Sequence, residues 1–175
     1  MSTQTVPNRP PDEARQATMR RITCVLALVW LGMMTSGCAT SPVATELPVG
    51  TVVASIDGVE FTARRVVAAT HVHGVLAIAA QVDDGRTIHL TMLSPRGIAV
   101  VAVGAGEQNS AQTGYQISKW SSNLVGGSGT VTVTAFTSDH AEGSFSYTAV
   151  AAPGTPATGR RIVVGRFNVS FAFAN

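Results

Sequence analysis

The stretch 143-GSFSYTAV-150 decides the fold class, because its side chains alternate between two kinds. Aromatic or small apolar residues occupy positions 145, 147 and 149, and Ser or Thr occupies each position between them. Successive side chains of an extended chain point to opposite faces. The alternation therefore predicts a β-strand with one face in a hydrophobic core and the other in water.

The same alternation appears on both sides of this stretch, in 129-GTVTVTAF-136 and 163-VVGRFNVSFAF-173. In the first, Val131, Val133 and Ala135 are expected to face inward and the threonines outward. In the second, the residues expected inward are Val163, Phe167, Val169, Phe171 and Phe173, and those expected outward are Arg166, Asn168 and Ser170. This is the longest alternating apolar face in the chain, so a strand over about 162–173 is predicted to lie inside a sheet.

Upstream segments carry hairpin signals. Residues 52–63 and 76–92 each contain two apolar runs around an Asp-Gly pair, which favours a tight turn between two strands. The apolar run 98–103 predicts a buried strand, 104–114 a loop and 115–120 a further strand. No segment after Cys38 has the 3.6-residue period of an amphipathic helix. These patterns predict an all-β protein, an antiparallel sandwich or barrel of about 8–9 short strands.

The first 37 residues have a different character and are predicted to be a leader. "MRR" at 19–21 precedes thirteen mostly apolar, uncharged residues at 22–34, too few to span a bilayer but the length of a signal-peptide h-region. The residues before Met19 are either a long n-region or lie upstream of the true start. The small residues 35-TSG-37 before Cys38 resemble the lipobox of bacterial lipoproteins, with Thr35 where Leu is usual.

That resemblance implies cleavage before Cys38 and attachment of a lipid, with palmitate among its acyl chains, to the thiol of Cys38. The implied partner is a membrane, and the implied location is the bacterial cell envelope, at the outer membrane or facing the periplasm. The other cysteine, Cys24, lies in the h-region, so an internal disulfide is not expected after cleavage. Residues 38–50 contain two prolines and no periodicity, and they are predicted to be a flexible tether before a domain at 51–175.

The folded part is predicted to be electrically neutral. Four of the twelve basic residues and two of the ten acidic residues precede Cys38, which leaves eight of each sign after it. A neutral domain lacks the basic surface that binds nucleic acids or anionic lipids, so a nucleic-acid partner is not expected.

Several segments together resemble an uncharacterised family of small bacterial lipoproteins. They are 55-SIDGVEFTA-63, 74-GVLAIAAQVDDGRTIHLTM-92, 127-GSGTVTVTAF-136, 142-EGSFSYTA-149 and 165-GRFNVSF-171. The resemblance covers nearly all of residues 52–173 and implies a β-sandwich on a lipid tether. It implies no activity.

Few residues suggest chemistry. His71 and His73 would share a face of a strand and are candidates for a metal pair, but two ligands do not complete a site, so neither a metal nor a cofactor is predicted. Tyr115 and Trp120 can stack on sugars or anchor a partner. On one straight strand their odd spacing would put them on opposite faces, with at most one exposed unless a bulge intervenes.

The sequence therefore predicts a membrane-anchored, non-catalytic binding or structural module whose ligand is a glycan, a peptide or a protein. No catalytic residue is assigned. The alternative is an envelope hydrolase, which would be recognised by a histidine within hydrogen-bond reach of a carboxylate in a concavity.

Overall fold

The computed structural model describes residues 46–93 and 97–173, apart from the side chains of Val66, Ala172 and Phe173. The predicted leader 1–37, with its h-region 22–34, and Cys38 lie outside the described residues. Over the described ranges the chain contains no helix of the length and apolarity that a bilayer crossing would need. The described residues form the strands β1 (Thr51–Ile56), β2 (Val59–Ala63), β3 (Val66–Val72), β4 (Val75–Gln81), β5 (Arg86–Leu93), β6 (Ala99–Gly104), β7 (Ser110–Tyr115), β8 (Ser118–Ser121), β9 (Ser128–Phe136), β10 (His140–Ala151), β11 (Arg160–Ser170) and β12 (Ala172–Phe173).

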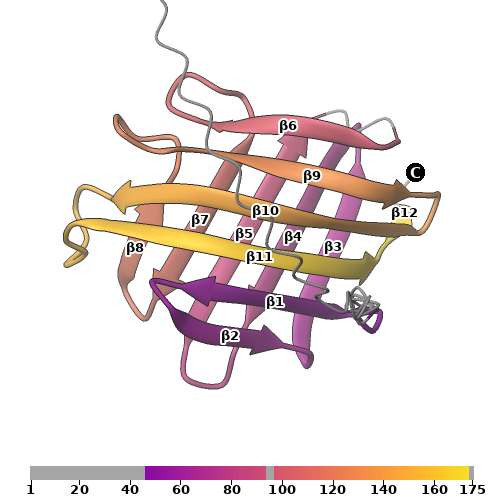
Figure 1. The fold of residues 1–175 in the computed structure, drawn as a ribbon, viewed down its shortest axis with the longest axis horizontal. Helices are drawn as coiled ribbons and strands as arrows, with labels where there is room; N and C mark the ends of the chain where they lie inside the picture. Colours follow the sequence, from indigo (N-terminus) through magenta and orange to yellow (C-terminus); the bar gives the residue numbers. More distant parts are fainter. Residues whose placement is uncertain (1–45, 94–96, 174–175) are drawn as a thin grey trace, which may run out of the picture. The chain divides into compact units, whose positions relative to one another are not determined.

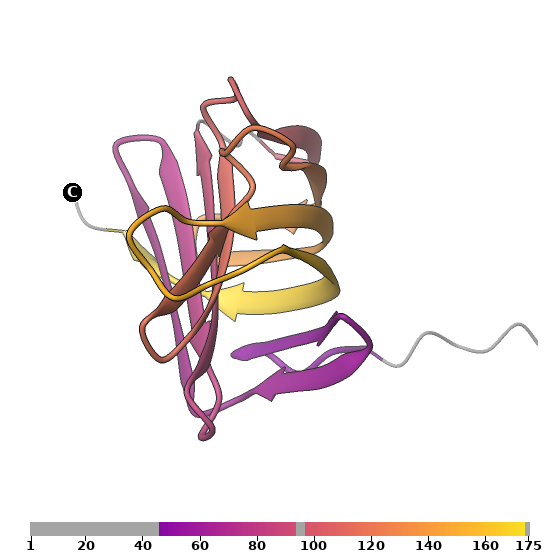
Figure 2. The same ribbon diagram turned by 90° about the vertical axis from the view of Figure 1, so that its left-hand side faces the viewer.

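The strands form two layers that lie face to face. One layer contains β3, β4, β5, β7 and β8, and the other contains β2, β1, β11, β10, β9 and β6. The strands of one layer cross those of the other, as Figure 1 shows, and Figure 2 shows the layers edge on. The layers join where Val150 and Ala151 of β10 pair with Ser121 and Trp120 of β8. The result is a nearly closed, antiparallel, barrel-like sheet, which confirms the all-β prediction.

The core fills the space between the layers, and β10 follows the predicted alternation closely. Phe145, Tyr147 and Ala149 are buried, as expected. The Tyr147 hydroxyl crosses the core and donates a hydrogen bond to the carbonyl of Gln112 on β7, at 3.0 Å. Burial raises the pKa of this phenol, so it remains a neutral donor. One hydrogen bond of the core therefore links the two layers.

Strand β11 is internal, as predicted, because it pairs with β10 on one side and β1 on the other. It ends at Ser170, however, and is not continuous to 173. After the buried Phe171, residues Ala172 and Phe173 form β12, which pairs with β3 in the other layer. The predicted inward position of the Phe173 side chain lies outside the described residues.

Two glycines of the central strands are covered by aromatic rings. Gly143 on β10 pairs with Phe167 on β11, and Gly165 on β11 pairs with Phe145 on β10. A Cβ atom on Gly143 would come within 2.7 Å of Phe167 Cζ, and one on Gly165 within 2.5 Å of Phe145 Cζ. Each ring thus lies over the backbone of the opposite strand, where a side chain would prevent it from packing.

On β9, a β-bulge makes one predicted inward position wrong. Between Glu142 and Gly143 the register with β9 shifts, so that Ala135 pairs with Glu142 while Val133 pairs with Gly143. The extra residue shifts the alternation by one. As a result Phe136, and not the predicted Ala135, packs against the core, with its ring centroid 5.8 Å from that of Phe171.

Strand β6 also differs from prediction. It pairs with β9 alone and is an edge strand, so Ile98 and Val100 are exposed while Val103 is buried. The apolar run 98–103 resembles a fully buried strand, but its outward face has no covering layer among the described residues.

The end of the predicted tether packs on the outside of β11. Leu47 is buried, and its carbonyl accepts a hydrogen bond from Asn168 Nδ2 at 2.6 Å. Asn168 Oδ1 lies 2.7 Å from His140 Nε2, and the Asn168 carbonyl accepts a hydrogen bond from the Gly50 amide at 2.8 Å. The prediction that Asn168 faces water is therefore wrong: it lies on the outer face, as expected, but residues 47–50 cover it. We call this group of contacts the Leu47–Asn168 clasp.

The pairing of β11 predicts how stability responds to mutation along this strand. Phe167 is fully buried, so Phe167→Ala should lower the free energy of unfolding by about 3–5 kcal/mol, a large part of the total for a small domain. Ser170, on the same strand, is exposed, and Ser170→Ala should change it by less than about 0.5 kcal/mol. Urea unfolding followed by circular dichroism measures both. Similar effects of the two substitutions would contradict the register of β11.

Candidate binding site

A tight turn brings the two predicted aromatic residues together. The segment 115–120 is not one strand but the end of β7, a turn at Gln116 and Ile117, and the start of β8. Gln116 has a φ of 53°, in the left-handed region that a tight turn requires. Trp120 thereby pairs with Thr113, and Tyr115 with Ser118. Paired residues share a face, as do residues 113 and 115, so Tyr115 and Trp120 lie on the same face and not on opposite ones. The N-terminal half of this hairpin, β7, begins inside the residues predicted as a loop, 104–114.

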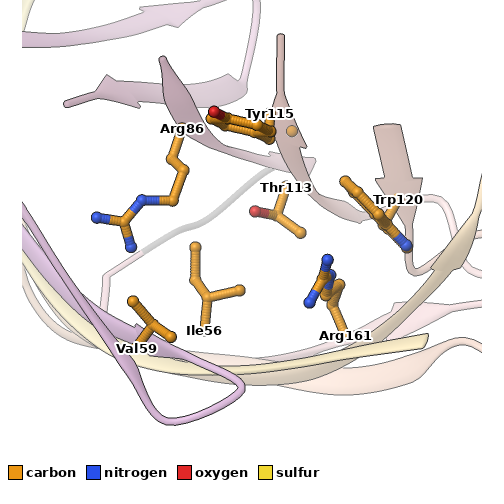
Figure 3. A pocket seen from close by; sticks show the side chains of 8 residues that line it. Ile56, Val59, Arg86, Thr113, Tyr115, Trp120 and Arg161 are labelled. Atoms are coloured by element: carbon orange, nitrogen blue, oxygen red, sulfur yellow. The ribbon is translucent and has the colours of Figure 1, made fainter. Parts of the chain in front are cut away.

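These two aromatic residues line a cavity at the end of the barrel where the β1–β2 and β7–β8 hairpins turn (Figure 3). The cavity has a volume of about 230 Å³ and is open to solvent. Its lining residues are Ile56, Val59, Arg86, Thr113, Gly114, Tyr115, Trp120 and Arg161. Tyr115 is 46% exposed and Trp120 only 6%, so the tyrosine forms the mouth and the tryptophan the wall.

Arg161 of β11 packs over the tryptophan. Its guanidinium carbon lies 4.6 Å from the centroid of the Trp120 ring, within the range of a cation–π interaction. On its other side, Arg161 Nη1 donates to Asp57 Oδ2 at 2.6 Å, and Asp57 Oδ1 accepts the Ile162 amide at 2.8 Å. The indole N–H of Trp120 donates to the Thr158 carbonyl at 3.0 Å. The Trp120 ring is therefore held by two groups of the segment 158–161, one of which, Arg161, is itself held by Asp57.

Arg86 of β5 forms the opposite wall. Its Nε donates to Asp84 Oδ2 at 2.7 Å, and its Nη1 donates to the Glu60 carbonyl on β2, also at 2.7 Å. Strand β2 is the last in its layer, so this bond links the edge of one layer to a strand of the other. The side chain thus bridges the two layers next to the cavity.

Both carboxylates that hold these arginines are stabilised in the charged form. The hydrogen bond from Arg161, with that from the Ile162 amide, lowers the pKa of Asp57 below its ordinary value. The hydrogen bond from the Arg86 amide, with that from its side chain, lowers the pKa of Asp84. Each guanidinium on the cavity wall is therefore paired with an ionised carboxylate at neutral pH.

The predicted histidine pair does not form on a strand. His71 lies on β3, with its ring centroid 5.3 Å from that of Phe136 and 5.7 Å from that of Phe171. His73 follows the end of β3, in the turn to β4, with a φ of 50°. A left-handed residue breaks the two-residue alternation, so the two imidazoles do not share a strand face as predicted. Within residues 46–93 and 97–173, no group of three or more His, Cys, Asp or Glu side chains is arranged to hold a metal ion.

The two arginines are the site residues that the sequence did not suggest. Each is one charged residue among many, and each bonds to a group from a distant segment: Arg161 pairs with Asp57, 104 residues away, and Arg86 donates to the Glu60 carbonyl, 26 residues away. A signal was nevertheless present for Arg86, because it follows the Asp-Asp-Gly turn, where an aspartate can accept the amide two residues on.

A comparison with protein families identifies one match. The model of a domain of unknown function (DUF6252) matches residues 50–167, which is more than half of the chain and contains every lining residue of the cavity. Neither the search of curated proteins nor that of solved structures found a match.

The Asp57–Arg161 pair predicts a pH dependence of stability. A carboxyl whose pKa is lowered on folding contributes stability that is complete above the unfolded pKa and is lost as the pH falls through the folded pKa. Asp57→Asn keeps a residue that tolerates the turn conformation but removes the charge. Because the pair is partly exposed, the loss at about pH 7 should be under about 1 kcal/mol.

Urea unfolding between about pH 7 and about pH 3 measures this difference. The gap between wild type and Asp57→Asn should narrow on acidification, starting near about pH 5. Ser170→Ala, which removes an exposed side chain without a titratable group, serves as the control, and its difference from wild type should stay constant over this pH range. A gap that is constant across the whole range would contradict the ion pair.

Proposed function

The chain belongs to the family described as a domain of unknown function (DUF6252), and since that description names no activity we propose a function from the geometry of the cavity. We propose that the protein is a non-catalytic binding module of the bacterial cell envelope. It is held at a membrane by a lipid on Cys38 and takes its ligand at the cavity beside Tyr115 and Trp120.

The observation that carries this proposal is the accessible aromatic surface of the cavity. A concave site with apolar walls and a few convergent polar groups is the usual form of a binding site. Tyr115 presents 46% of its surface to solvent at the mouth, and the Trp120 ring behind it is held by Arg161 and Thr158. A rigid wall and an exposed ring at the entrance suit the capture of a ligand more than the movement of a proton.

The position of the cavity supports a role at the end of a tether. Arg161 lines the cavity at the start of β11, while the Leu47–Asn168 clasp lies seven residues further along the same strand, roughly 23 Å away. The chain therefore enters the domain at the end opposite to the cavity. A lipid anchor before Leu47 would leave the mouth of the cavity pointing away from the attachment.

The anchor has a direct test. If Cys38 is acylated, the protein should partition into the detergent phase and be labelled by a palmitate analogue in the bacterium. Cys38→Ser should abolish labelling and leave uncleaved precursor or soluble protein. Cys24→Ser is the matched control and should leave the label in place, because that residue lies in the predicted h-region. Labelling that survives in Cys38→Ser would refute the anchor.

The binding site has a separate test. A library of small fragments, charged and uncharged, should shift the amide NMR signals of the residues that line the cavity. The signals of β6, which lies at the edge of its layer opposite to β2, should not shift. Tyr115→Ser removes the ring at the mouth and should weaken the best fragment at least about tenfold, the equivalent of losing one buried side-chain contact. Ile98→Ser removes an exposed apolar residue away from the cavity and should have no effect. Shifts that gather elsewhere, or equal effects of the two variants, would contradict this site.

A further inference from the structure

The size of the cavity limits how much of a ligand it can enclose. Sites that enclose a drug-sized molecule have volumes of about 300–1,000 Å³. This cavity has about 230 Å³ and opens to solvent. It can enclose one compact group, while the remainder of the ligand must lie outside the mouth.

The charges around the cavity are already matched. Arg86 lies 2.7 Å from Asp84, and Arg161 lies 2.6 Å from Asp57. A charged group entering the cavity would lose its water without gaining an unpaired counter-ion from either arginine, which is unfavourable. The walls between the two ion pairs are formed by apolar groups such as Ile56 and Val59. A hydroxyl-rich ring would lose hydrogen bonds to water there for the same reason.

The surface around the mouth is suited to a larger partner. Val59 is 58% exposed and Tyr115 46% exposed, and Ile117, at 73%, occupies the hairpin turn two residues beyond Tyr115. Apolar side chains gathered around a pocket are typical of protein–protein contact sites. Tyrosine, tryptophan and arginine, all present here, are the residues that most often dominate binding energy at such contacts.

From these three observations we infer that the cavity receives a single uncharged, apolar side chain of a peptide or protein partner, whose main chain lies across Val59, Tyr115 and Ile117. The inference rests on the binding function proposed above and names its ligand class. The side chain enters as an anchor, and charged residues are excluded from that position because the arginines of the cavity wall are already paired with Asp84 and Asp57.

A tryptophan reporter makes the test direct. The chain has two tryptophans, Trp30 and Trp120, so the full chain carrying Trp30→Phe has its single tryptophan in the cavity wall. The probes are N-acetyl-leucinamide, N-acetyl-lysinamide, the α-amide of N-acetylglutamate and methyl β-glucopyranoside. The leucine probe should change Trp120 fluorescence saturably and bind at least about tenfold more tightly than each of the other three.

A matched pair of variants locates the binding. Val59→Phe narrows the mouth and should weaken the leucine probe at least about tenfold. Val100→Phe makes the same change at an exposed position on β6 and should leave the affinity unchanged. Equal weakening by both variants would overturn the assignment of the side chain to this cavity.

The remaining outcomes distinguish a failure of this inference from a failure of the proposed binding function. Tighter binding of the lysine or glutamate probe would overturn the uncharged class, and tighter binding of the glucoside would indicate a glycan; either result leaves a binding module in place. Saturation by none of the four probes would overturn the side-chain inference, while the fragment shifts at the cavity test the binding function independently.

Discussion

Strand β10 is the element on which both layers depend, because it is bonded to three neighbours. One of its edges pairs with β11 along nearly its whole length, while the other edge is divided between β9 and, at Val150 and Ala151, β8. Antiparallel strands satisfy their backbone groups only through such pairing. Since β8 belongs to the crossing layer, β10 is where the sheet turns from one layer into the other. The inward side chains of β10, Phe145 and Tyr147, then fill the angle between the layers.

The close packing of β10 and β11 against the neighbouring strands β9 and β1 depends on Gly143 and Gly165 as much as on the aromatic rings. A Cβ on Gly143 would meet the Thr132 carbonyl oxygen at 2.2 Å, and one on Gly165 would meet the Val53 carbonyl oxygen at 2.4 Å. These are backbone atoms, which cannot move aside as a flexible side chain can. Glycine usually weakens a strand, because it has no side chain to pack. Here the ring of the opposite residue supplies the missing contact, so the reciprocal Gly–Phe pairs make the strands compatible with a tightly curved sheet.

The strands that carry this core could be predicted from sequence because alternation is a local property, and the Asp57-Gly58 and Asp83-Asp84-Gly85 hairpins could be predicted because their turns require those residues. The turn at Gln116 and Ile117 could not, because neither residue is typical of a tight turn. That single omission placed Tyr115 and Trp120 on opposite faces, so the sequence did not predict that the two rings line one cavity. The arginines were hidden for another reason: their roles depend on Asp57 and Glu60, whose proximity to them arises only when the layers close.

The Leu47–Asn168 clasp also has a mechanical consequence. It lies at one end of β1 and β11, and the cavity lies at the other end of the same two strands. A pull between the chain before Leu47 and a molecule held at the cavity would act along these strands. The ladder bonds between antiparallel strands are perpendicular to their axes, so such a load would shear many of them at once instead of opening them one after another. Tension applied between the chain before Leu47 and the cavity would therefore be resisted by all the ladder bonds between β1 and β11 at once.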